Sequence, residues 1–235
     1  MLSRLARAYR IRGPAQFLCL ISKNLKYYGT YPFKRRQSWN GDSFDRQHGT
    51  DTAGIREIGS LGIHSANAVY AVRYEVTGEG VALRALSSVP ADVSTFSLVD
   101  YGCGKGKILL LASEHSYRSL IGVEFAPELV NIARRNVAAF ERSKGKDCHI
   151  TVLCADVVDY DPPEGHLVAY LYNPFDCFVV KKVEEKLRQS ALRSGCDIFV
   201  IYVDPVHKCV WQDQQFWQVV VEDEVFIVYR SSRLT

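Results

Sequence analysis

The stretch Leu98–Gly106, with the sequence LVDYGCGKG, decides the fold of this chain. It predicts a β-strand that runs into a glycine loop of the form D-x-G-x-G-x-G, and the apolar run Ile108–Ala112 after it predicts a helix. Each glycine removes a side chain and permits a positive φ, so a ligand can approach the backbone closely. Backbone amides at the start of the helix then face any polar group in that place. The stretch therefore predicts a nucleotide-like ligand at the carboxyl end of a first parallel strand.

Strands and helices alternate from this point toward the C-terminus. Predicted strands are Ser97–Tyr101, Leu120–Glu124, Ile150–Cys154, Leu167–Tyr172 and Ile198–Val203, and predicted helices between them are Lys107–His115, Pro127–Arg142 and Cys177–Ser194. Such alternation indicates right-handed crossovers and a parallel sheet that is covered on both faces. The stretches 216–221 and 224–230 are joined too closely for a crossover, so they predict an antiparallel hairpin. We expect an α/β fold, Rossmann-like and doubly wound, with a mostly parallel seven-stranded sheet, an antiparallel C-terminal hairpin and a helical N-terminal extension.

The N-terminal region differs from the rest in charge and in pattern. Residues 1–36 hold nine Lys or Arg and no acidic residue, whereas residues 37–235 hold 20 basic and 26 acidic residues, a net charge of −6. We expect residues 1–66 to form a basic helical extension with a long irregular connection over 29–66, a candidate substrate lid, and residues 67–235 to form the main domain. The basic residues predict either an anionic partner or a helical cap whose charges are solvated.

The composition is that of a globular protein, with 47% hydrophobic and 23% charged residues. Seven cysteines lie scattered without a C-x-x-C pair, which predicts reduced thiols in a cytoplasmic protein and no metal site. No apolar run approaches the ~20 residues of a transmembrane helix. The arginine-rich start also leaves an organelle transit peptide open as an alternative.

Polar residues follow the next three predicted strands. Glu124 ends the second strand, where a carboxylate can accept from both hydroxyls of a ribose. Asp156 follows the third strand, where it can accept from an adenine amino group, and Asn173-Pro174-Phe175 follows the fourth. Because these residues form an ordered set behind one glycine loop, chance explains them poorly.

With these motifs the chain resembles the class I S-adenosylmethionine-dependent methyltransferases over roughly residues 70–230. A weaker resemblance, carried by Tyr74–Gly78 and by Gly-Lys-Gly in the loop, is to the Dot1-like lysine methyltransferases and their bacterial relatives. The resemblance implies S-adenosylmethionine as cofactor, no metal, and cofactor contacts from Tyr74, Thr77, Asp100, Gly102, Cys103, Gly104, Gly106, Glu124, Asp156, Val157 and Asn173. Lys105 is either a partner of the methionine carboxylate or a solvent-facing lysine.

The resemblance also implies catalytic residues. Amino-group methyltransferases often carry an Asp/Asn-Pro-Pro-aromatic turn at this place, and Tyr172–Asp176 matches it in part. Asn173 is then the acceptor of the amine hydrogen bonds and Phe175 packs the substrate, unless the turn is structural and Phe175 lies in the core. His207, after the fifth strand, is a candidate base because histidine titrates near neutrality.

We therefore expect a methyltransferase that acts on an amino nitrogen of a protein lysine, a nucleobase or a small-molecule amine. The alternative is a nucleic-acid-binding protein with a methyltransferase-like fold and little or no catalysis. A nicotinamide-dependent oxidoreductase is disfavoured, because its glycine spacing would be G-x-G-x-x-G.

Overall fold

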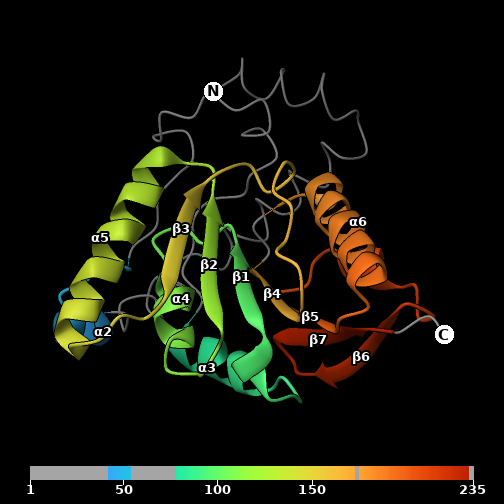
Figure 1. Ribbon diagram of the computed structural model, residues 1–235, viewed down its shortest axis with the longest axis horizontal. Coiled ribbons are helices and arrows are strands. Elements are labelled where there is room, and N and C mark those ends of the chain that lie inside the picture. The colour runs from blue at the N-terminus through green and yellow to red at the C-terminus, as the bar shows by residue number, and fades with distance from the viewer. Residues whose placement is uncertain (1–41, 54–77, 173–174, 233–235) are drawn as a thin grey trace, which may run out of the picture. The chain divides into compact units, whose positions relative to one another are not determined.

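The computed structural model describes residues 42–53, 78–172 and 175–232, and these residues belong to one compact unit. Their central feature is a seven-stranded sheet with the order β3-β2-β1-β4-β5-β7-β6 (Figure 1). The strands are β1 (Ser97–Tyr101), β2 (Ser119–Glu124), β3 (Ile150–Cys154), β4 (Leu167–Tyr172), β5 (Ile198–Val203), β6 (Trp217–Glu222) and β7 (Phe226–Ser231).

Strands β1 to β5 run parallel to one another, and β7 runs antiparallel to both β5 and β6. The chain order reverses at β1, which pairs with β2 on one side and with β4 on the other. A reversal of this kind opens a crevice beyond the carboxyl ends of the strands, where α/β proteins bind ligands. The predicted parallel sheet and its antiparallel hairpin are confirmed.

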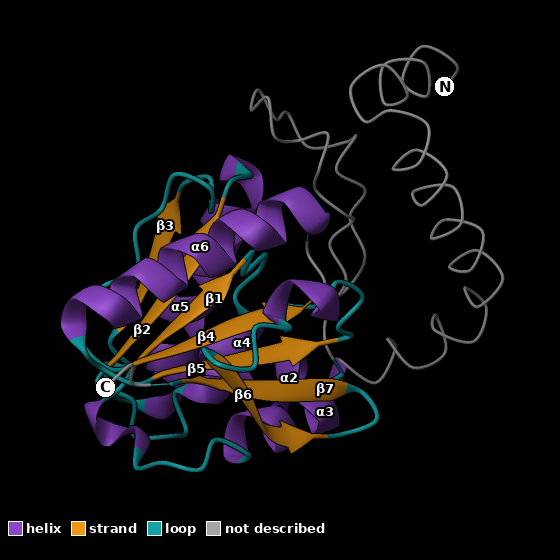
Figure 2. Ribbon diagram, turned by 90° about the vertical axis from the view of Figure 1, so that its right-hand side faces the viewer, coloured by secondary structure: helices purple, strands orange, loops and turns teal. Residues whose placement is uncertain are grey.

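Helices cover both faces of the sheet, which is why β1, β4 and β5 are buried along nearly their whole length. One hydrophobic cluster joins the sheet to α3 (Glu79–Ser87), α4 (Lys107–Ala112) and α5 (Pro127–Lys144). The other joins it to α6 (Cys177–Ser194) and to the 3₁₀ turn η5 (Lys208–Trp211). Figure 2 shows α6 in front of the sheet and α5 behind it.

The helix ends follow local signals. Gly145 and Gly195 take left-handed φ values of 65° and 63° directly after α5 and α6, a common helix stop. The helix expected over 107–115 ends earlier, at Ala112, because the amides of Glu114 and His115 bond to carbonyls three residues back and tighten the last turn.

One expectation for the N-terminal region is wrong. Residues 29–66 were expected to lack regular structure, but α2 (Asp42–His48) is a helix. Phe44 anchors it, because its ring stacks on Phe140 of α5 with 5.9 Å between the centroids. The helical extension expected before residue 42 lies outside the described residues, and a domain boundary near residue 66 stays a prediction.

No helix within 42–53, 78–172 or 175–232 combines the length and the hydrophobicity that crossing a membrane requires.

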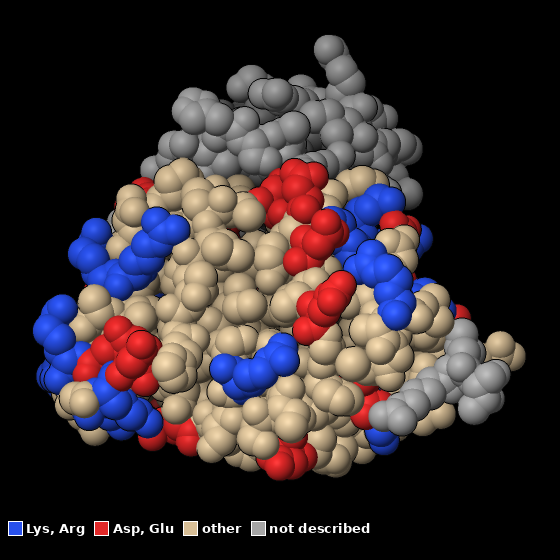
Figure 3. Space-filling model, viewed as in Figure 1, with Lys and Arg blue, Asp and Glu red and all other residues tan. Residues whose placement is uncertain are grey.

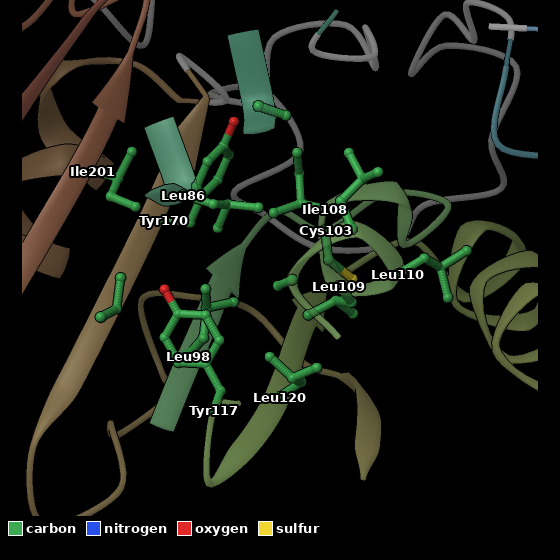
Figure 4. Packing of buried hydrophobic residues seen from close by; sticks show 14 of the residues in the cluster. Leu86, Leu98, Cys103, Ile108, Leu109, Leu110, Tyr117, Leu120, Tyr170 and Ile201 are labelled. Carbon is green, nitrogen blue, oxygen red and sulfur yellow. The ribbon is translucent and has the colours of Figure 1, made fainter. Parts of the chain in front are cut away.

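Gly122 lies at the centre of the packing between β2 and α4. A Cβ atom there would stand 2.6 Å from Leu109 Cδ1 and 2.7 Å from Cys103 Sγ. Figure 4 shows Leu109 and Cys103 side by side within this cluster. Gly122 is thus the position at which the glycine loop and α4 come close enough to pack on β2.

We predict that Gly122→Ala destabilises the protein by about 1–3 kcal/mol, because a methyl group must displace well-packed atoms. Chemical denaturation of both proteins measures the change. Gly80→Ala is the matched control: Gly80 lies in α3, and apart from its own helix no described residue comes within 4 Å of the added Cβ, so this change should be neutral or stabilising. Equal effects of the two substitutions would contradict the packing argument.

Candidate cofactor site at the carboxyl edge of the sheet

The predicted site residues in the described part of the chain come together at one edge of the sheet. Asp100 and Glu124 lie near or at the ends of β1 and β2, and Asp156 lies just past β3. Phe175 and His207 follow β4 and β5. Because these five strands are parallel and in register, their carboxyl ends share this edge.

The glycine loop between β1 and α4 is a tight turn with positive φ at Gly102 (80°), Gly104 (53°) and Gly106 (86°). The amides of Gly102 and Cys103 donate to the carbonyl of Val123, which ties the loop to β2. L-residues with side chains rarely adopt such φ values, so the three glycines are required by the backbone itself. The loop presents main chain at the edge of the sheet, as its glycine spacing predicts.

Glu124 connects this loop to the start of α5. Its carboxylate accepts hydrogen bonds from the amide of Gly104 (3.0 Å to Oε2) and from the amide of Ala126 (2.9 Å to Oε1). The side chain is 4% exposed, and burial raises its pKa to about 7 although these amides act in the opposite direction. Each carboxylate oxygen has two acceptor positions, so the two amides orient Glu124 without using up its acceptor capacity.

Asp100 is a second buried acid beside Glu124. It pairs in register with Gly122, two residues before Glu124, so the two acids lie on the same face of adjacent strands. Asp100 is 3% exposed, and its Oδ2 atom has no hydrogen-bond partner among the residues that the structure describes. Burial, and then the nearby Glu124, raise the pKa of Asp100 to about 8. A buried carboxyl oxygen without a partner is unusual in a native structure and is typical of a functional site.

Asp156 begins a turn after β3. Its carboxylate accepts from the amide of Val158 (3.0 Å), and its carbonyl accepts from the amides of Asp159 and Tyr160. Asp156 itself remains partly exposed, whereas the side chain of Val157 is buried in the cluster on the α6 side. The structure thus fixes the backbone at 156–157 next to the ends of β2 and β3.

Two predicted site residues are packed into the core. The Cys103 thiol is buried against Leu109, and burial raises its pKa well above the ordinary range, so it is no reactive thiolate. Phe175 is 5% exposed and belongs to the cluster that joins α6 to the sheet. This is the core position left open as the alternative for Phe175, and it gives the ring a packing role.

Of the remaining predicted site residues, the structure describes His207 but not Tyr74, Thr77 or Asn173. His207 is half-buried, and its backbone amide donates to the hydroxyl of Tyr202 (3.3 Å). Tyr74, Thr77 and Asn173 lie outside the described residues.

Lys105 lies in the middle of the glycine loop and does not face solvent, so the solvent-facing alternative for this residue is wrong, whereas pairing with the methionine carboxylate stays a prediction. It is 3% exposed, and its ammonium donates to Asp51 Oδ1 (2.6 Å) and to the carbonyl of Ala53 (2.7 Å). Asn136 of α5 joins the same group, and neither it nor Asp51 was predicted. The sequence signal was weak: Asn136 is a polar residue within the apolar stripe of α5.

Charged residues on the face drawn in Figure 3 are mixed, with Lys and Arg gathered toward its two sides and Asp and Glu among and between them. The basic residues that predict an anionic partner, within 1–36, lie outside the described residues. Among the residues that the structure describes, no group of three or more His, Cys, Asp or Glu is arranged to hold a metal ion.

The buried acids predict how stability depends on pH. Since the pKa values of Asp100 and Glu124 are raised on folding, their contribution to stability is full below about pH 4 and is lost as the pH rises through about 7 to 8. The melting temperature of the ligand-free protein should therefore fall between pH 5 and pH 8.5, and Asp100→Asn should flatten this slope. Each kcal/mol corresponds to roughly 2–4 °C in a domain of this size.

Asp92→Asn is the control for this measurement. Asp92 is exposed, and the backbone amide of Ser94 holds its pKa below the ordinary value, so its titration is complete below pH 5. This variant should keep the wild-type slope. A full slope in Asp100→Asn would show that Asp100 is not the titrating group.

Part of this chain is similar to known methyltransferases. Residues 98–194 match the family model described as a methyltransferase domain. No curated protein matches the chain.

Among solved structures, the chain is similar to an RNA methyltransferase from Salinibacter ruber in complex with S-adenosyl-L-homocysteine. The identity is 22% over 68% of this chain and 94% of that one, and the TM-score is 0.46.

Two further solved structures show the same degree of likeness. A precorrin-6y C5,15-methyltransferase from Geobacter metallireducens has 14% identity over 75% of this chain and 95% of that one, with a TM-score of 0.48. A ribosomal protein L11 methylase from Lactobacillus delbrueckii has 15% identity over 66% and 78%, with a TM-score of 0.46. Likenesses this distant do not identify an acceptor. Residues 98–194, which span the glycine loop and both buried acids, are thus similar to a methyltransferase domain.

Proposed function

We propose that this protein transfers the methyl group of S-adenosylmethionine to an amino nitrogen, with the cofactor bound at the carboxyl edge of β1, β2 and β3. One observation carries the proposal. Asp100 and Glu124 are buried on one face beside the glycine loop, and Asp100 Oδ2 has no hydrogen-bond partner within residues 42–53, 78–172 and 175–232. Two acids buried together favour a ligand that brings positive charge and hydrogen-bond donors.

The residues at this edge fit an adenosyl cofactor. Glu124, oriented by two backbone amides, would accept from the ribose hydroxyls. Asp156, with the backbone at Val157, would contact the adenine. The amino-acid end would lie against Gly102, Gly104 and Gly106, where Asp100 is its acidic neighbour.

Three further residues belong to the proposed cofactor contacts. Cys103 lies in the same loop, and its backbone is the part available to a ligand because its thiol is packed against Leu109. Tyr74 and Thr77 are proposed from sequence, in the segment before the core.

S-adenosylmethionine, when bound, supplies a methyl group on an electrophilic sulfonium. The chain then has to align the acceptor nitrogen and exclude water. We assign Asn173 to this alignment, since its side-chain and backbone carbonyls would accept from the amine, with a further contact to the cofactor. Phe175 supports the turn from within the core. His207 is the second candidate, as the base that takes the proton released by the amine.

The cofactor assignment predicts that Glu124→Ala weakens binding of S-adenosylhomocysteine by about 1.5–3 kcal/mol, roughly a 10- to 150-fold rise in Kd. The reason is the loss of hydrogen bonds to a charged acceptor. Isothermal titration calorimetry measures the Kd. Glu128→Ala, an exposed glutamate in the first turn of α5, is the matched control and should leave the Kd unchanged. Failure of the wild-type protein to bind either form of the cofactor would refute the proposal.

The acceptor class is tested with methyl-labelled cofactor and cell extract. We expect label in an amine that survives acid hydrolysis, in the protein, RNA or small-molecule fraction. Label released as methanol by base, which indicates a methyl ester, or label identified in a methyl ether would contradict an amino-nitrogen acceptor. Cofactor binding without transfer, together with salt-sensitive nucleic-acid binding that disappears when residues 1–36 are deleted, would favour a binding protein instead.

With the acceptor fraction known, the pH profile separates the roles of Asn173 and His207. Asn173→Ala should lower kcat by about 100-fold at every pH, because the alignment of the amine is lost. His207→Gln should remove the acid limb of the kcat profile if His207 is the base. An unchanged profile in His207→Gln would exclude that role.

A further inference from the structure

Lys105 is the cation closest in sequence to the proposed cofactor contacts. Its side chain contacts residues 51 and 53, which come from another part of the chain. Its ammonium is bound by Asp51 Oδ1 at 2.6 Å and by the carbonyl of Ala53 at 2.7 Å. Lys105 is buried, whereas the Asp51 side chain is 64% exposed. A lysine held out of water needs such acceptors, because an unpaired buried charge is strongly destabilising.

Asn136 of α5 makes hydrogen bonds to both partners of this contact, residue 51 and Lys105. Its side-chain amide donates to the carbonyls of Asp51 (3.0 Å) and Lys105 (2.9 Å), and its Oδ1 accepts from the amide of Asp51 (2.8 Å). Asn136 is buried as well. One side chain thus joins the glycine loop, α5 and residue 51, so these three parts of the chain are fixed relative to one another.

The segment Asp42–Ala53 is shaped by its own hydrogen bonds. The carboxylate of Asp45 accepts from the hydroxyls of Thr50 and Thr52 and from the amides of Thr52 and Ala53. Burial alone would raise the pKa of Asp45, but these bonds bring it below the ordinary value. The segment therefore presents Asp51 and the Ala53 carbonyl to Lys105 as a formed turn.

The glycine loop is consequently bound at two consecutive residues, Gly104 and Lys105, by two different parts of the chain. The Gly104 amide donates to Glu124, the proposed ribose acceptor, and the next side chain, Lys105, is bound by the Asp42–Ala53 segment. Undocking of that segment would leave Lys105 buried without its acceptors. The loop would have to move to bring the ammonium to water, and this would disturb the bond between Gly104 and Glu124.

We infer that Lys105 is a positioning residue: it ties the cofactor loop to the Asp42–Ala53 segment, so that cofactor binding and docking of this segment favour each other. The inference rests on the proposed function, which places the cofactor at this loop. Coupling between two binding events is reciprocal, so each must strengthen the other by the same factor.

Asp51→Ala tests the inference without touching the loop or the buried acids. We expect the Kd for S-adenosylhomocysteine to rise at least fivefold, and Asp51→Asn, which keeps an acceptor oxygen, to give an intermediate value. Adding Lys105→Met to Asp51→Ala should raise the Kd by less than the product of the two single effects, because both changes break one contact.

Arg188→Met is the matched control, since Arg188 binds Glu184 and Asp213 on the other side of the sheet. It should lower stability while changing the Kd less than twofold. Equal rises in Kd for Asp51→Ala and Arg188→Met would show a general loss of stability and would overturn the inference. An unchanged Kd in Asp51→Ala would also overturn it.

Hydrogen exchange supplies the reciprocal measurement on the full chain. S-adenosylhomocysteine should slow exchange of the amides of Thr52 and Ala53 in the wild-type protein and should slow it less in Asp51→Ala. Slowing that is equal in both proteins, or missing in the wild type, would refute the coupling. If the wild-type protein does not bind the cofactor, the proposed function is refuted. If the wild-type protein binds it and Asp51→Ala binds it equally well, the coupling is refuted and the proposed function is not.

Discussion

The hydrogen bonds between the Glu124 carboxylate and the amides of Gly104 and Ala126 organise the whole site. They join the glycine loop after β1 to the start of α5 across the end of β2. These two amides lie in a turn and at the start of a helix, where backbone amides have no helical acceptor. The buried carboxylate of Glu124 accepts their hydrogen bonds in a place that water does not reach. The geometry of this edge therefore depends on one acid, and it is also the acid that we propose as the ribose acceptor.

Charge is distributed around the loop in a way that suits a cationic cofactor. Lys105 is the cation of the loop, and its ammonium is bound by Asp51 and not by Asp100 or Glu124. The pKa of Asp100 is governed by burial and by Glu124, both of which raise it. Ionisation of these acids in the folded protein is thus costly, and a ligand with positive charge reduces that cost.

Much of the fold was predictable because its signals are local. The limits of β1, β3, β4, β5 and α6 agree with their expected ranges, since apolar runs and glycine stops mark them in the sequence. The prediction for α4 was too long, because nothing in the apolar run showed that the last turn would tighten after Ala112. The helix α2 was missed, because seven residues rich in polar side chains carry little periodicity and depend on Phe44 packing against Phe140.

The sequence by itself determined the order of strands and helices, the glycine loop and the acids at the strand ends, since each depends on residues that are close in the chain. The tertiary structure alone decided how those residues are used: that Cys103 and Phe175 belong to the core, that Asp100 is buried beside Glu124, and that Lys105 binds a segment more than 50 residues earlier. Burial and pairing of charges arise from contacts between residues far apart in the chain. No local sequence pattern predicts such burial and pairing. A lysine such as Lys105 is stable either in water or beside a carboxylate that folding brings to it, and the residues around it in the sequence are the same in both cases.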